Sequence, residues 1–153
     1  MPLRASTELA AVYWIKSLPE IASLPVAVVL ADAESEFEDA AQGFVTVHAI
    51  GGSPHMYLPQ REPVVEINTW VALPNNQKSP WPASSYIADT IIAATYDPAN
   101  FGHVLTHPDY ENIRMMSAYP LTEPTRFEDD DGRYARYVFE MQLHWVGDPH
   151  DDW

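Results

Sequence analysis

Hydrophobic and polar residues alternate most regularly in the segment from Arg133 to Val146. Large apolar residues take every second position there, at Tyr137, Phe139, Met141, Leu143 and Trp145. Polar residues lie between them, at Arg136, Glu140, Gln142 and His144. This period of two predicts a long antiparallel strand with a buried face and a wetter face. An acidic turn at 128–132 precedes the strand, and Pro149 marks its end.

Three earlier segments also have the pattern of strands, namely 43–50, 63–71 and 111–119. In the segment 63–71 one face carries Val65, Ile67, Thr69 and Val71, whereas the other carries Val64, Glu66, Asn68 and Trp70. Gly51-Gly52 and Pro54 predict the end of the first of these strands. The segment 111–119 is expected to pair with 133–146 in a hairpin that spans the acidic turn. The apolar segment 25–30 suits a short buried strand or a covered loop.

Two segments predict helices. Ser6 or Thr7 can cap the first helix, in which Leu9, Val12 and Tyr13 share one face. Ser79-Pro80-Trp81-Pro82 is a typical start signal for the second helix. Its apolar stripe comprises Tyr86, Ile87, Thr90, Ile91, Ala94 and Thr95. The order of these elements predicts an α+β fold, a mostly antiparallel sheet with two main helices packed on one face.

Composition and charge narrow the class of protein. The chain of 153 residues is expected to form one domain over 1–153, with a short acidic tail at 148–153. No segment has the pattern of a membrane span or an export signal, and the absence of cysteine excludes disulfides and thiolate chemistry. Eight basic residues stand against 22 acidic ones, a net charge of −14. This balance argues against sequence-specific nucleic-acid binding.

Acidic residues are concentrated in two segments. The first, 32–39, has five acids and no base, and the second is the turn at 128–132. These acids are either a solvated surface or an acidic rim that faces a partner or a channel. The candidate lumen- or partner-facing residues are Glu34, Glu36, Glu38, Asp39, Asp129, Asp130 and Asp131.

Catalytic motifs are weak in this chain. His103 and His107 are four residues apart, a spacing that could place two metal ligands on one helix face. However, they lie in a proline-containing segment without the glutamate of a zinc-hydrolase motif. The serines lack a nucleophile-elbow context and no glycine-rich phosphate loop occurs. We therefore expect no catalytic residue, no cofactor and no metal site, with a small metal-dependent hydrolase as the less favoured alternative.

The order of these elements resembles one family of virion proteins. An N-terminal helix, a strand with Val-x-Ile-x-x-Trp at 65–70 and a helix opened by Ser79 are followed by a strand that ends at Tyr119-Pro120. An acidic turn and a strand with Arg-Tyr-x-Arg-Tyr-Val at 133–138 complete the pattern. This combination is similar to the tail terminator proteins of long-tailed bacteriophages, especially those that infect actinobacteria.

The resemblance implies a hexameric ring at the head-proximal end of the tail tube, located in the virion tail and assembled in the host cytoplasm. Its partners would be further copies of itself, the tail tube protein and a head–tail connector or stopper protein, and DNA would pass through the lumen without specific binding. No catalytic residue is implied. The candidate subunit-interface residues are Phe37, Arg136, Glu140, His144 and Trp153. Another head–tail joining protein or a tail tube protein of similar fold is the structural alternative.

Overall fold

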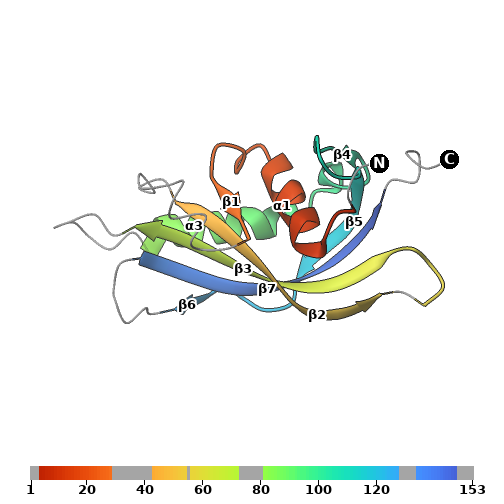
Figure 1. Ribbon diagram of the computed structural model, residues 1–153. Helices are drawn as coiled ribbons and strands as arrows, with labels where there is room; N and C mark the ends of the chain where they lie inside the picture. The colour runs from red at the N-terminus through yellow and green to blue at the C-terminus, as the bar shows by residue number, and fades with distance from the viewer. Residues whose placement is uncertain (1–3, 29–42, 55, 73–80, 128–133, 148–153) are drawn as a thin grey trace.

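The computed structural model of the protein describes residues 4–28, 43–54, 56–72, 81–127 and 134–147 (Figure 1). Its elements, in chain order, are α1 (Thr7–Ser17), β1 (Val26–Ala27), β2 (Phe44–Pro54), β3 (Arg61–Ala72), α3 (Trp81–Ala94), the short 3₁₀ helix η2 (Pro98–Asn100), β4 (Val104–Leu105), β5 (Ile113–Pro120), β6 (Thr125–Phe127) and β7 (Tyr134–Gly147). Neither α-helix in this described part of the chain is long and apolar enough to cross a membrane.

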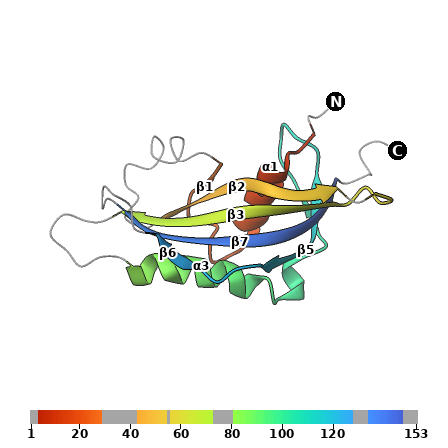
Figure 2. The ribbon, with the colours of Figure 1, turned by 90° about the horizontal axis from the view of Figure 1, so that it is seen from below.

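Seven strands of the described residues form one curled sheet (Figures 1 and 2). Their order is β1-β2-β3-β7-β5-β4, and β6 pairs with β7 beyond the end of β5. All neighbouring pairs are antiparallel except β1 with β2, which is parallel. The expectation of mixed helices and strands with a mostly antiparallel sheet is thus confirmed.

Strand β7 pairs with more strands than any other in this sheet, because β3 lies along one of its sides and β5 and β6 share the other. The predicted alternation holds: Phe139, Met141, Leu143 and Trp145 are at most 2% exposed. Tyr137, at the same face, is only half-buried. The predicted pairing of 111–119 with this strand is also confirmed, since β5 pairs with β7 over Ile113–Pro120. However, β6 follows β5 in the chain and also pairs with β7, so β5 and β7 are not consecutive strands of one hairpin.

The main core brings the helices and strands together in one cluster of buried side chains. Ser6 caps α1, as predicted, because its Oγ accepts a hydrogen bond from the Leu9 amide at 3.2 Å. From α1 the cluster takes Trp14 and Ile15, and from α3 it takes Ile91, each at most 1% exposed. The same cluster contains Val65 and Ile67 of β3 and Phe139, Met141, Leu143 and Trp145 of β7.

A reciprocal pair of hydrogen bonds attaches α3 to β3. The Thr69 hydroxyl donates to the Ser84 carbonyl at 3.0 Å, and the Ser84 hydroxyl donates to the Thr69 carbonyl at 3.0 Å. Both residues are completely buried, so each polar group needs the partner that the other residue supplies. The predicted face of β3 that carries Thr69 is therefore the face that contacts α3.

The structure corrects the predicted end of β2. This strand continues through Gly51-Gly52 to Pro54, which pairs with Arg61, and the register shifts between Ala49 and Gly51. Gly52 has φ +91°, and a Cβ there would lie 2.5 Å from the Glu62 carbonyl oxygen. The glycines therefore permit a bulge and a close approach of the two strands, rather than a turn that ends them.

Three further segments can be compared with the sequence analysis. The proline-containing segment 99–110, which includes His103 and His107, contains part of η2 and the short strand β4. The proposed cap Ser79 lies outside the described residues, and the described helix α3 begins at Trp81. The segment 25–30 does contain a short strand, β1, which pairs with β2 at Val26↔Val45.

Replacing Phe139 by alanine tests the buried face of β7. Phe139 is 1% exposed and pairs across the sheet with Ile67, so its removal leaves a cavity in the core. We expect Phe139→Ala to lower the free energy of unfolding by roughly 3–5 kcal/mol in urea denaturation. Tyr86, predicted as part of the apolar stripe of α3, is instead 69% exposed, because the neighbouring helix position Ile87 is the one that faces the core. Tyr86→Ala is therefore the control and should change the free energy of unfolding by less than about 0.5 kcal/mol. A loss of less than about 1 kcal/mol for Phe139→Ala would contradict this packing.

Candidate functional site

The face of β3 and β7 opposite α3 carries an ordered set of polar and aromatic side chains, here called the polar face. It comprises Glu66, Asn68 and Trp70 of β3 with Tyr134, Arg136, Glu140, Gln142 and His144 of β7. Because successive residues of a strand point to opposite faces, these side chains alternate with the core residues described above. Three of them, Arg136, Glu140 and His144, are candidate interface residues from the sequence.

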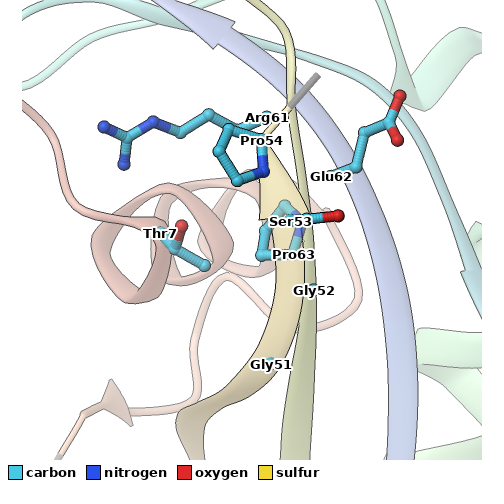
Figure 3. Close-up of a pocket in the computed structure, with 8 residues that line it drawn as sticks. All are labelled: Thr7, Gly51, Gly52, Ser53, Pro54, Arg61, Glu62 and Pro63. Atoms are coloured by element: carbon cyan, nitrogen blue, oxygen red, sulfur yellow. The ribbon is translucent and has the colours of Figure 1, made fainter. Parts of the chain in front are cut away.

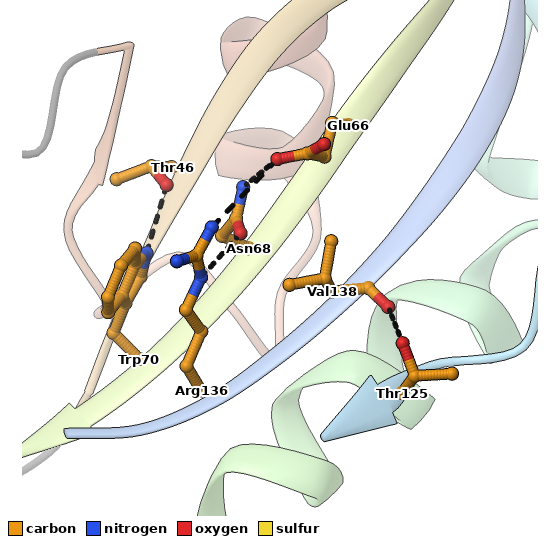
Figure 4. Close-up of polar contacts among 7 residues, drawn as sticks. All are labelled: Thr46, Glu66, Asn68, Trp70, Thr125, Arg136 and Val138. Atoms are coloured by element: carbon orange, nitrogen blue, oxygen red, sulfur yellow. Dashed lines mark hydrogen bonds and ion pairs between the residues drawn. The ribbon is translucent and has the colours of Figure 1, made fainter. Parts of the chain in front are cut away.

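Arg136 lies at the centre of a hydrogen-bonded series on this face (Figure 4). Its Nε donates to Asn68 Oδ1 at 2.8 Å, and Asn68 Nδ2 donates to Glu66 Oε1 at 3.1 Å. The Arg136 guanidinium also lies 4.0 Å from the same Glu66 oxygen. The side chains of Arg136 and Glu66 are 21% and 31% exposed, so the ion pair is only partly screened by water.

Two aromatic rings hold the Arg136 guanidinium from either side along the sheet. Its central carbon lies 4.4 Å from the Trp70 ring centroid and 4.2 Å from that of Phe127. Trp70 and Phe127 are its cross-strand partners on β3 and β6. Cation–π contacts of this kind stabilise by about 0.5–2 kcal/mol, more when water is excluded. The guanidinium is therefore fixed in place, although it belongs to the wetter side of the strand.

Aromatic packing continues from Arg136 toward β2. Trp70 stacks on Phe44 with 5.8 Å between ring centroids, and Tyr134 meets both rings edge-on. The Trp70 indole N–H donates to the Thr46 hydroxyl at 2.9 Å. This polar atom therefore has a hydrogen-bond partner although the residue is almost fully buried, with only 5% of its surface exposed. This end of the polar face is consequently a second small core, consisting of Phe44 and Trp70 with half-buried neighbours.

The other end of the polar face is more open. His144 Nδ1 lies 2.9 Å from the Ser117 hydroxyl, and the Tyr119 ring meets the imidazole edge-on. Gln142 Nε2 donates to the Glu62 carbonyl at 2.8 Å and to the Pro63 carbonyl at 3.1 Å. These bonds join β7 to β3 where the regular pairing skips two residues, from Arg61↔Trp145 to Val64↔Gln142.

Glu140 is directly opposite Glu66 on the neighbouring strand. Two carboxylates in this position repel each other, and Arg136 approaches the Glu66 side of the pair. Arg136, Glu140 and His144 thus share one face, as their spacing predicted, and all three are half-buried. The remaining candidate residues lie outside the described residues, namely Glu34, Glu36, Phe37, Glu38, Asp39, Asp129, Asp130, Asp131 and Trp153.

A separate groove lies between α1 and β4, here called the α1–β4 groove. It has a volume of about 340 Å³ and is lined by Leu9, Val12, Tyr13, Lys16, Ser17, Leu105, Thr106 and His107. The His107 ring stacks on Tyr13 at 5.1 Å, and its Nδ1 accepts a hydrogen bond from the Asp109 amide at 3.1 Å. His103, its predicted companion, is exposed. Within the described residues, no three His, Asp or Glu side chains come together as a metal site.

Tyr13 is chemically unusual among the groove residues. Its hydroxyl is buried and has no hydrogen-bond partner within the described part of the chain. Burial raises the pKa of the Tyr13 phenol to about 12, with smaller contributions from Tyr110 and Asp109. A phenol that stays protonated far above neutral pH is a hydrogen-bond donor rather than a base.

The β2–β3 hairpin carries a group of exposed apolar side chains that the sequence analysis did not single out. It extends past the helices at one end of the sheet (Figure 1), and the ends of its two strands next to the connecting loop form an open pocket of about 210 Å³ with Thr7 of α1 (Figure 3). At its end, Met56, Tyr57 and Leu58 are 83%, 84% and 56% exposed. Three consecutive large apolar residues between Pro54 and Pro59 are the signal that could have found this site.

No family model matches this chain, and no curated protein matches it either.

Replacing Arg136 tests whether the polar face is held together by the guanidinium. Arg136→Met keeps most of the side-chain length but removes the donors to Asn68 and the charge beside Glu66. We expect it to lower the free energy of unfolding by about 1–3 kcal/mol at low salt. The control is Arg126→Met, because Arg126 is exposed and makes a cation–π contact with Trp81 but no ion pair within the described residues. Arg126→Met should lower the free energy of unfolding by at most about 1 kcal/mol. Equal losses for the two variants would contradict the assignment.

Replacing Tyr13 by phenylalanine tests the raised pKa. Above pH 10 the unfolded chain loses the phenolic proton, whereas the folded chain keeps it until about pH 12, so stability falls across this interval. In Tyr13→Phe this part of the fall should disappear, together with one late step in the ultraviolet titration of tyrosinate. At pH 7 the variant should be as stable as the wild type or more stable by up to about 1 kcal/mol, because no hydrogen bond is lost. An unchanged alkaline titration would contradict the assignment.

Proposed function

We propose that this chain is a tail terminator protein of a long-tailed bacteriophage. In this proposal, copies of it form a hexameric ring at the head-proximal end of the tail tube. The ring stops polymerisation of the tube protein and offers the surface that joins the head–tail connector or stopper protein. It acts as a structural component of the virion, assembled in the host cytoplasm, and carries out no catalysis.

The single observation that carries the proposal is the combination of β3, α3, β5 and β7 in the order that the resemblance requires. Strand β3 contains the Val-x-Ile-x-x-Trp pattern, and β7 contains most of the Arg-Tyr-x-Arg-Tyr-Val pattern. Trp70 and Arg136, one residue from each pattern, are cross-strand partners in direct contact. The two sequence patterns therefore meet in one contact between neighbouring strands. A resemblance that includes this contact is more specific than one based only on the order of helices and strands.

The arrangement of helices gives further support. We infer that α1 and α3 both pack on the same face of the sheet, because residues of both helices join one core cluster with Val65 and Ile67. The polar face would then remain available to neighbouring subunits or to the lumen. Arg136, Glu140 and His144 lie on it, as the proposed interface requires.

The charge of the chain suits a channel for DNA. The chain has 22 acidic and 8 basic residues. This balance produces a negative field that repels phosphates and prevents DNA from binding as it passes. In this proposal the acidic segments at 32–39 and 129–131 face the lumen or a partner. A terminator caps the end of a tube, whereas a tube protein of similar fold polymerises. The test therefore compares capping with polymerisation.

Electron microscopy of tail tubes mixed with the purified protein tests the function. We expect added density at one end of each tube and no further growth when tube protein is supplied. Glu140→Lys reverses a charge on the polar face and should reduce end binding at least about tenfold, which corresponds to 1.4 kcal/mol. Asp89→Lys, an exposed site on α3, is the matched control and should bind as the wild type does. Bare tube ends would refute the proposal, and long fibres of the protein alone would favour a tube protein.

A further inference from the structure

The α1–β4 groove combines an apolar wall with a basic side. Its apolar wall consists of Leu9 and Val12 of α1 and Leu105 of β4. Its volume of about 340 Å³ is at the lower end of the range for ligand pockets, so it suits one or two side chains rather than a large ligand. An occupant with apolar surface of its own would be stabilised there, because that surface and the wall would both be removed from water.

The polar part of the groove favours an anion. Its described lining contains Lys16 and His107 and no acid, in a chain with 22 acidic and 8 basic residues. His107 Nδ1 accepts a hydrogen bond from the Asp109 amide, so the neutral ring carries its proton on Nε2, which can donate to a carboxylate. Asp109 itself is not among the lining residues. The groove therefore favours an occupant that is both apolar and acidic.

The C-terminal segment 148–153, Asp-Pro-His-Asp-Asp-Trp, has both properties. It lies outside the described residues. It contains three aspartates and no lysine or arginine, and Trp153 provides one large apolar ring. Tryptophan is among the residues that most often dominate the energy of a contact. Pro149 has no backbone N–H to donate, so the pairing of β7 with β5 is not expected to continue into this segment.

The segment starts within reach of the groove. Ile113 of β5 pairs with Gly147, the last residue of β7, on one side and with Leu105, in the groove wall, on the other. Gly147 and Leu105 are therefore two strand spacings apart, about 10 Å. Residues 148–153 span up to about 20 Å when extended. The end of β7 also lies at the end of the sheet where β5 and β4 are found (Figure 1).

The start of α1 lies beside the end of β7 as well, because the Glu111 carboxylate contacts both. This carboxylate accepts a hydrogen bond from the Ala5 amide at 3.1 Å, and a Cβ placed on Gly147 would lie 3.0 Å from its Oε2. Leu9, in the groove wall, follows Ala5 by four residues, about one helical turn. The C-terminal segment therefore begins beside the first turn of the helix that forms one wall of the groove.

We propose that the C-terminal segment docks in the α1–β4 groove of its own chain, with the Trp153 ring against the apolar wall. The aspartates of the segment lie beside Lys16 and His107. Docking covers the wall and ties the end of β7 to α1. The groove of the same chain is favoured over that of a second copy, because a short tether gives an effective concentration on the order of 1 mM. Two copies, each with a net charge of −14, also repel each other.

Disulfide closure tests the docking, because the chain has no cysteine of its own. The test variant carries Asp152→Cys in the C-terminal segment and Leu9→Cys in the groove wall. The control combines Asp152→Cys with Val104→Cys, at a residue that is 36% exposed and does not line the groove. Val104 precedes Leu105 in β4, so it faces the opposite side of the sheet at the same strand distance from β7. Mass spectrometry of the oxidised monomer should show closure at least about tenfold faster in the test variant.

Substitutions added to the test variant separate the ring from the charge. Trp153→Ser should slow closure at least about tenfold, since it removes the apolar anchor. Lys16→Glu should slow it about threefold, the scale of an exposed ion pair. Lys16→Arg keeps the charge and is the matched control, with a rate within about twofold of that of the test variant. Circular dichroism checks that each variant remains folded.

Equal closure rates with Leu9→Cys and Val104→Cys, or a rate that Trp153→Ser leaves unchanged, would overturn the docking. Equal rates for Lys16→Glu and Lys16→Arg would overturn the placement of the aspartates. Disulfide-linked dimers that replace the closed monomer as protein concentration rises would also overturn the proposal, because the segment would then occupy the groove of a second copy. Closure is measured on the chain alone, so its outcome is independent of binding to tube ends.

Discussion

The pairing of β3 with β7 is the interaction on which the rest of this structure depends. Ile67 opposite Phe139 and Val65 opposite Met141 place the apolar side chains of both strands on one face. A shift of the pairing by one residue would move these side chains to the opposite face and bring the polar ones into the core. The positions of β2, β5 and β6 follow from this register, because each pairs with β3 or β7.

The same register explains why the wetter side of the sheet is not simply solvated. It places Trp70 opposite Arg136 and Phe127 on the other side of that arginine. The guanidinium is therefore held between two rings and bonded to Asn68, whereas Glu140 has only another acid, Glu66, opposite it. The polar groups around Arg136 therefore have partners within the chain. The Glu140 region keeps a negative charge, which a partner or the lumen would meet in the proposed ring.

Local patterns were sufficient to predict strands β3, β5 and β7 and the cap of α1. The alternation in β7 and β3 and the cap at Ser6 each depend on residues that are neighbours in sequence. The long hairpin was missed because Gly51-Gly52 is also a common turn signal, and only the partner strand shows that Gly52 fits against the Glu62 carbonyl. The α1–β4 groove was also beyond prediction, since it joins Tyr13 with His107, which are distant in sequence.

In the proposed ring, one chain would meet its own copies and also let DNA pass. Contact between copies favours surfaces where repulsion is weak, and the described lining of the α1–β4 groove has one base, Lys16, and no acid. Passage of DNA favours the opposite, a surface with excess negative charge. The chain has 22 acidic and 8 basic residues, so most of its surface suits the second requirement. Strong overall acidity is therefore compatible with the proposed self-association when copies meet away from most of the acids.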